Sequence, residues 1–187
     1  MTTTTTVPTT ATGTYAIDPS HSRIGFVARH AMVSKVRGSF NEFDGSGYYD
    51  AEDPTQSHLQ LAINAPSIDT RNADRDAHLR SNDFLDMDNH PEITFTSTAV
   101  EALDADTYRV TGDLTIKGVT KPVTIDFAYE GSATDPYGNV RVGFEGRTTI
   151  NRKDWGVSWN TALEAGGVLV GEKVTLEFEV SAIRTES

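Results

Sequence analysis

The chain has 187 residues, a formal net charge of -11 and no cysteine. A surface this acidic repels phosphate backbones, so we expect no nucleic-acid partner, and it also disfavours adsorption of the whole molecule to anionic membranes. The absence of cysteine excludes disulfides, thiolate nucleophiles and zinc sites built on sulfur. Hydrophobic residues make up 37% and charged residues 23%, which is typical of a soluble globular domain.

The N-terminal segment, residues 1–13, is dominated by threonine and predicts a disordered tail, because it offers little apolar surface to a core. We expect residues 14–187 to form a single domain. The tail shows neither the basic region nor the apolar run of an export signal, and no later segment is apolar for long enough to span a bilayer. These features predict a cytoplasmic protein that is not embedded in a membrane.

From about Tyr15 onward, apolar and polar residues alternate, which is typical of strands with one buried face. In RIGFVARH, for example, Ile24, Phe26, Ala28 and His30 share one side of the strand. The same pattern recurs in segments 57–65, 92–100, 107–116, 123–129, 140–146 and 174–180.

The connections contain turn residues: Asp-Gly-Ser-Gly at 44–47, Lys-Gly at 117–118 and Asp-Pro-Tyr-Gly at 135–138. About eight such strands fit an all-β fold, an extended antiparallel up-and-down barrel of the lipocalin-like kind. A two-sheet sandwich is the alternative, since alternation alone does not separate the two architectures. A barrel of about eight strands holds packed side chains or one slender ligand.

One segment, about 73–86, breaks the period of two and contains neither proline nor glycine. Several of its apolar residues recur near helical spacing, and Asp69 or Asn72 can cap its start. We predict a short amphipathic helix, interrupted near residues 81–82, that lies across one end of the barrel.

The run from Arg75 to Pro91 is rich in arginine, histidine and aspartate, and its charge density suggests chemistry. Asp86, Asp88 and His90 follow the spacing of a calcium loop, but a proline stands where that loop needs glycine. The HExxH zinc motif is absent as well. The spacing therefore predicts no metal site of a known type.

Two interpretations of this run stay open. The functional one is a site that combines His78, Asp83 and His90. The structural one, which we favour, has Asp76 and Arg80 as an ion pair at helical spacing. On that interpretation the residues that anchor a lid over the barrel end are Arg75, Asp76, His78, Leu79 and Arg80.

No nucleotide-binding, phosphate-loop or serine-hydrolase motif occurs, so we expect no catalytic residues and no cofactor. His30 falls on the apolar side of its strand. It is either a satisfied core residue or a hydrogen-bond donor to the head group of a ligand.

The segment 151–159 holds both tryptophans of the chain beside a basic pair. It is either a loop that closes a barrel end with aromatic bulk or a portal. In the portal, Trp155 and Trp159 line a lipid tail while Arg152 and Lys153 meet an anionic head group.

The sequence resembles the YceI-like family of lipocalin-like, polyisoprenoid-binding proteins, in pieces that keep their order along almost the whole chain. The pieces are IDPSHSRIGFVARH at 17–30, VRGSFNEFDG at 36–45, INAPSIDTRNADRDAHLRSNDFLDMDNHPEITFTS at 63–97, TGDLTIKGVTKPVTI at 111–125, NRKDWGVSW at 151–159 and VGEKVTLEFEV at 170–180.

The resemblance implies an extended antiparallel barrel with a long apolar cavity, a bound isoprenoid or fatty-acid-type lipid, a homodimer and no established catalysis. Many family members are exported, and this sequence shows no export signal, so the identity of its ligand is left open. Small inward residues such as Gly112 and Gly146 predict open space in the barrel. The expected cavity wall consists of Phe26, Ala28, His30, Phe40, Phe43, Phe84, Phe95, Leu114, Phe127, Phe144, Trp155, Trp159 and Phe178.

These observations converge on a protein that carries or sequesters a long-chain amphiphilic lipid, held mainly by burial of apolar surface. Two alternatives remain. One is an enzyme that acts on an isoprenoid or quinone-type lipid, with His30 or His78 as its acid–base group. The other is a filled barrel that works as a protein-interaction module.

Overall fold

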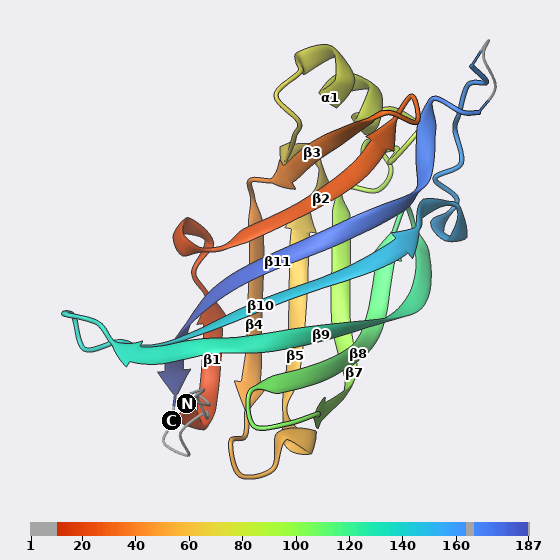
Figure 1. The fold of residues 1–187 in the computed structure, drawn as a ribbon. Coiled ribbons are helices and arrows are strands. Elements are labelled where there is room, and N and C mark those ends of the chain that lie inside the picture. Colours follow the sequence, from red (N-terminus) through yellow and green to blue (C-terminus); the bar gives the residue numbers. More distant parts are fainter. Residues whose placement is uncertain (1–10, 164–166, 187) are drawn as a thin grey trace.

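The structure is a computed structural model that describes residues 11–163 and 167–186. It contains one α-helix, α1 (Ala73–Arg80), which lies beyond one end of a large antiparallel sheet (Figure 1). The strands are β1 (Gly13–Ile17), β2 (Arg23–His30), β3 (Ser34–Phe40), β4 (Phe43–Tyr49), β5 (His58–Asn64), β6 (Ile68–Asp69), β7 (Glu92–Ala102), β8 (Thr107–Ile116), β9 (Val119–Thr134), β10 (Val140–Asn151) and β11 (Val170–Glu186). Short 3-10 turns are η2 (Pro19–His21), η3 (Pro54–Gln56), η4 (Ala65–Ser67) and η5 (Arg152–Trp155).

The sheet closes into a barrel. Its order runs β1-β4-β5-β7-β8-β9-β10-β11, and β11 returns to pair with β1, so these eight strands form a ring. The long β11 also pairs with β2 along its first part, and β3 and β6 continue from β2. This ring confirms the predicted barrel and excludes the two-sheet sandwich.

We call the barrel end that carries α1 the upper end, as it is drawn in Figure 1. The β2–β3 turn and the segment between β10 and β11 lie at this end, and the β4–β5 and β7–β8 connections lie at the lower end. The predicted tail lies outside the described residues up to position 10. Ala11 is already part of the domain, because it is buried and its carbonyl oxygen accepts a 2.6 Å hydrogen bond from the Tyr15 hydroxyl.

Alternation places one face of each strand inside the barrel, where apolar side chains form the core. The main cluster includes Ile24, Ile63, Phe95, Val110 and Ile125. The period of two is broken in β7, where the register with β8 shifts between residues 97 and 99. This bulge brings Val100 into the buried set, although it is an odd number of residues after Phe95.

One predicted turn is wrong. The Asp-Gly-Ser-Gly run at 44–47 lies inside β4 and pairs with β5. A Cβ on Gly47 would stand 2.7 Å from the carbonyl oxygen of His58, so glycine here permits a close approach of two strands. The other two turn predictions are confirmed, since Lys117 and Gly118 have positive φ between β8 and β9 and residues 135–138 join β9 to β10.

The predicted helix is confirmed and is shorter than expected. Asn72 is its N-cap and accepts a 2.9 Å hydrogen bond from the backbone N–H of Arg75, and Ser81 caps its end. Residues 81–90 continue as turns rather than as helix. Among the described residues, no helix is long and apolar enough to cross a membrane.

Candidate ligand cavity

Two apolar cavities lie one above the other inside the barrel. The lower one has a volume of about 180 Å³ and the upper one about 160 Å³. Both are lined by Leu61, Phe95, Ile125 and Phe178, four residues that come from β5, β7, β9 and β11. We call this shared ring the waist. The two cavities therefore share a boundary at the waist, and we call the interior space that they make up together the lumen.

The volumes suit a chain rather than a globular ligand. An apolar cavity of about 150 Å³ accommodates a benzene-sized molecule, so each cavity offers room for roughly one isoprene unit or a similar length of acyl chain, and more if side chains move apart. Apolar walls of this kind exclude water and reward burial of hydrocarbon.

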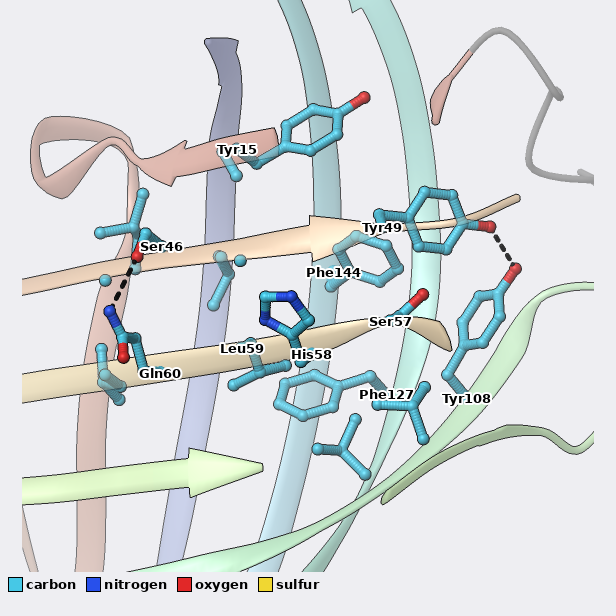
Figure 2. A pocket seen from close by; sticks show the side chains of 18 of the residues that line it. Tyr15, Ser46, Tyr49, Ser57, His58, Leu59, Gln60, Tyr108, Phe127 and Phe144 are labelled. Carbon is cyan, nitrogen blue, oxygen red and sulfur yellow. Dashed lines mark hydrogen bonds between the residues drawn. The ribbon is translucent and has the colours of Figure 1, made fainter. Parts of the chain in front are cut away.

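Tyrosines line the lower cavity (Figure 2). The hydroxyls of Tyr49 and Tyr108 point at each other and share a 2.7 Å hydrogen bond. Burial raises the pKa of Tyr49, and the hydrogen bond with Tyr108 raises it further, so the phenol stays neutral at physiological pH. Ser46 and Gln60, 3.3 Å apart, add neutral polar groups to the same cavity.

The upper cavity is roofed by the lid. Leu79 of α1 and the following Phe84 and Leu85 line it from above. Trp155 lines it from η5, is only 3% exposed, and donates a 2.9 Å hydrogen bond from its indole N–H to the Leu114 carbonyl. Aromatic bulk therefore closes this end, in line with the loop interpretation of residues 151–159.

Most of the expected wall residues line one or both cavities, and whether they contact a ligand stays a prediction. Those that line them are Phe26, Ala28, Phe40, Phe84, Phe95, Leu114, Phe127, Phe144, Trp155 and Phe178. Phe43 packs against the main core without lining a cavity, and Trp159 lies outside the lining against His78 and Phe84.

His30 corrects one expectation. Alternation places it inward, but the structure leaves it exposed at the last position of β2. The strand reaches the barrel rim there and turns back into β3, so no interior remains for the side chain to enter. His30 is neither a core histidine nor part of the cavity wall.

The two cations expected to meet a head group are engaged with the protein. Arg152 is buried and donates to the carbonyls of Gly171, Val157, Trp159 and Val170 at 2.7–3.2 Å. Four of its five N–H groups are thereby used. Burial lowers the pKa of Arg152, and the four carbonyl groups stabilise the positive charge of its guanidinium.

Lys153 lies on the outside of the barrel. Its Nζ is 2.8 Å from the Glu172 carboxylate, and both side chains are about half exposed. The carboxyl of Glu172 has a lowered pKa chiefly because of this hydrogen bond. An anionic head group would have to compete with Glu172 for this lysine.

The lid is anchored on Thr70, a residue that is 3% exposed. Asp76 Oδ1 accepts from the Thr70 N–H at 2.9 Å and from its hydroxyl at 2.6 Å. Arg75 donates from Nε to the Thr70 hydroxyl oxygen and from Nη2 to the Thr70 carbonyl, at 2.7 and 2.6 Å. Both charged side chains thus hold the chain that enters the helix.

The predicted Asp76–Arg80 ion pair is wrong. Arg80 instead donates to the carbonyls of Pro66 and Ile68, at 3.1 and 3.3 Å. Asp76 faces the barrel side of the helix and is buried against Thr70, whereas Arg80 is exposed, so the helical spacing does not bring them together.

His78 does contact Asp83, with 2.8 Å between Nε2 and Oδ2. Its ring also packs edge-on against Phe84 and Trp159, at centroid distances of 4.9 and 4.6 Å. His90 does not join them. Within the described ranges no three histidine or carboxylate side chains gather as a metal site.

Sequence reasoning missed the waist and Thr70. Leu61 and Ile125 were placed inward by alternation, but nothing in their own segments distinguishes a shared ring from ordinary core. Thr70 lies between β6 and α1, and only the folded chain brings it onto Asp76.

Comparison with known proteins decides the family. A model of the YceI-like domain matches residues 15–182. The chain belongs to the YceI-like family. This confirms the resemblance read from the sequence. One relative is a UPF0312 protein of Pectobacterium atrosepticum, which is 45% identical over 138 residues; the alignment covers 74% of this chain and 71% of the relative. Another is a UPF0312 protein of Pseudomonas aeruginosa, which is 45% identical over 145 residues; the alignment covers 76% of this chain and 75% of the relative.

Solved structures share the YceI-like barrel. A Campylobacter jejuni YceI protein superposes with a TM-score of 0.73 at 28% identity, over 84% of this chain and 90% of that one. Burkholderia cenocepacia BcnA superposes with a TM-score of 0.77 at 24% identity, over 88% of this chain and 98% of that one. A domain from Saccharophagus degradans described as polyisoprenoid binding superposes with a TM-score of 0.68 at 15% identity, over 91% of this chain and 98% of that one. The last two likenesses show a common fold.

Proposed function

We propose that this YceI-like protein binds a long-chain isoprenoid or a similar amphiphilic lipid inside its barrel, and carries or sequesters it. The observation that supports this most directly is the lumen: two apolar cavities that share the waist of Leu61, Phe95, Ile125 and Phe178. A slender chain threaded through the waist would bury hydrocarbon along the whole barrel.

The binding energy would come from the tail. Each buried methylene group contributes about 0.8 kcal/mol, so a chain of several isoprene units needs few polar contacts to bind well. This agrees with the state of the two expected head-group cations, Arg152 and Lys153, which already have protein partners. The polyisoprenoid-binding domain of Saccharophagus degradans, which shares the barrel, supports the same ligand class.

The experiment is mass spectrometry of organic extracts from protein purified without detergent. We expect a long-chain lipid close to one per chain. The Ala28→Phe variant fills the upper cavity from β2 and should lose that lipid. Its matched control is Val27→Phe, one residue earlier on the outer face of the same strand, which should keep it.

The proposal would be overturned if the purified protein contained no lipid and also did not bind added prenyl or acyl probes. So would equal lipid content in the Ala28→Phe and Val27→Phe variants, because the lipid would then sit outside the upper cavity. The filled-barrel alternative requires side chains to occupy the interior completely, and the open volume of the two cavities disfavours it.

The enzyme alternative retains one observation, the His78–Asp83 pair beside the lid. A carrier should release its lipid with unchanged mass after long incubation, and His78→Ala should leave the mass of the recovered lipid unchanged too. New products that disappear in His78→Ala would support catalysis instead.

The homodimer implied by the family resemblance stays a prediction, to be tested by light scattering.

A further inference from the structure

The β2–β3 turn carries unusual apolar exposure for so acidic a protein. Met32 is 57% exposed and Val33 is 81% exposed, and both project at the upper end of the barrel. Single exposed apolar residues are common on protein surfaces, but two adjacent ones at the end of a hairpin form a small exposed hydrophobic patch. We call residues 31–33 the tip.

Three cations stand directly behind the tip. Arg29, Lys35 and Arg37 are all exposed, on the face of β2 and β3 opposite to the one that carries the cavity residues Phe26 and Ala28. In the described part of the chain, no carboxylate lies within ion-pair distance of any of the three.

Two of these cations face each other. Arg29 and Lys35 are direct cross-strand partners. Like charges in this position destabilise a strand pair. In a chain with 27 acidic and 16 basic residues, a basic cluster on one hairpin is a local reversal of the overall charge. An anionic partner would relieve the repulsion.

The tip itself is strained. Ala31 and Met32 have φ angles of 51° and 66°, and Val33 N–H donates to the His30 carbonyl at 3.2 Å, which closes a turn of the kind that favours asparagine and glycine. A second bond, from the Ala31 N–H to the Leu169 carbonyl at 2.7 Å, holds the turn against the neighbouring loop. An exposed methionine in a left-handed conformation is costly, and such strain concentrates at functional positions.

We propose that the tip and its three cations dock the protein onto the surface of an anionic lipid bilayer. The apolar side chains Met32 and Val33 would enter the interface, and the cations would meet lipid phosphates. An apolar insertion combined with a basic patch gives reversible attachment rather than permanent anchoring. The net charge of the whole chain does not prevent this, because charges more than about 8 Å away are largely screened at physiological ionic strength.

The position of the tip gives docking a purpose. His30, next to the tip, pairs with Val170, and both Val170 and Ala28 line or flank the upper cavity. Docking would therefore hold the upper end of the lumen at the bilayer, where a lipid leaves or enters. This last step rests on the proposed lipid binding, whereas docking itself does not.

The test is co-sedimentation with vesicles of equal parts phosphatidylcholine and phosphatidylglycerol, compared with vesicles of phosphatidylcholine alone. We expect binding to the anionic vesicles only, weakened by added salt. Lys35→Glu should reduce the affinity on the order of tenfold, since one basic side chain alone accounts for roughly fivefold. Met32→Glu should reduce it similarly.

Two controls match these variants. Lys121→Glu reverses an exposed lysine on β9, and Leu103→Glu changes an apolar residue, 43% exposed, in the β7–β8 turn at the lower end. Both should bind vesicles as the unmodified protein does. All four variants change exposed positions. Lys35→Glu places opposite charges across the strand pair and should raise the melting temperature slightly, and the other three variants should keep it.

Absence of binding to anionic vesicles at low salt, or equal losses in the tip variants and the controls, would overturn the proposal. So would a tip whose variants change only the oligomeric state, because the tip would then contact a second copy of the chain. The two proposals fail separately: Ala28→Phe should lose lipid and keep vesicle binding, and Lys35→Glu should lose vesicle binding and keep uptake of a prenyl probe in solution.

Discussion

At the residue scale, the glycines of the barrel do not leave the open space that their small size predicts. A Cβ on Gly146 would stand 2.6 Å from the Phe127 ring, and one on Gly112 would stand 2.5 Å from the Phe95 ring. Each glycine thus makes room for an aromatic ring.

Gly112→Ala should therefore push the Phe95 ring further into the lumen and strain β7. The new methyl group would also meet the Thr96 carbonyl oxygen at 2.6 Å, so the backbone has to shift. We expect a loss of about 1–3 kcal/mol in the free energy of unfolding, measured by urea denaturation, because overpacking a core has this order of cost.

The control is Gly143→Ala in β10, where the nearest atom to an added Cβ is 3.6 Å away. It should be neutral or slightly stabilising, since alanine reduces the freedom of the unfolded chain. Equal stability of the two variants would show that the ring does not depend on Gly112.

At the element scale, the lid is a short helix whose hold on the barrel comes from its charged residues. Eight residues give little helix stability on their own, so tertiary contacts decide whether α1 forms. Asp76 and Arg75 supply such contacts through Thr70, and Leu79, Phe84 and Leu85 supply them through the cavity roof. The charges that first suggest catalysis have a structural role here.

Asp76→Ala should loosen the lid. It removes the acceptor of the buried Thr70 N–H and hydroxyl, and leaving buried donors unpaired costs about 1–3 kcal/mol. Urea denaturation should show that loss, and a bound prenyl probe should dissociate faster. Asp74→Ala on the exposed side of the same helix should do neither. Unchanged stability and unchanged probe dissociation in Asp76→Ala would contradict the anchoring role.

At the scale of the whole molecule, Arg141 links distant parts of the barrel. Its Nη1 lies 2.8 Å from Asp18, after β1, and its Nε lies 2.8 Å from Asp135 in the β9–β10 turn. The Arg141 hydrogen bonds are the main reason that the pKa of Asp135 falls to about 2 and that the pKa of Asp18 lies well below its usual range.

These shifts predict how stability depends on pH. Both carboxyls have a lower pKa in the folded state than the ordinary value of 3.8, so their ionised forms favour folding above that value. The contribution is lost as the pH falls toward about 2. In Arg141→Gln, unfolding free energies measured across this range should fall less steeply with acid. An equally steep fall would show that Arg141 does not set these pKa values.

Much of the barrel follows from local pattern, because alternation is a property of each strand alone. It placed Phe26, Leu61 and Phe178 inward correctly. It failed for His30, where the strand runs out of the barrel, and for Val100, where a bulge shifts the phase. The anchoring of Asp76 and the engagement of Arg152 depend on partners that only the closed fold brings near.

The central claim is that the two cavities act as one lumen for one long chain. The most direct measurement is the affinity for a series of prenyl alcohols of one, two and three isoprene units: prenol, geraniol and farnesol. Each added methylene-sized group should gain up to about 0.8 kcal/mol while the chain still reaches apolar wall.

Leu61→Trp would block the waist that both cavities share. We predict that affinity rises along the series in the unmodified protein. Leu61→Trp should abolish the gain for the two longer alcohols, whereas prenol should still bind and the melting temperature should stay near that of the unmodified protein. An affinity that stops rising at prenol, or a series unaffected by Leu61→Trp, would contradict a continuous lipid-binding lumen.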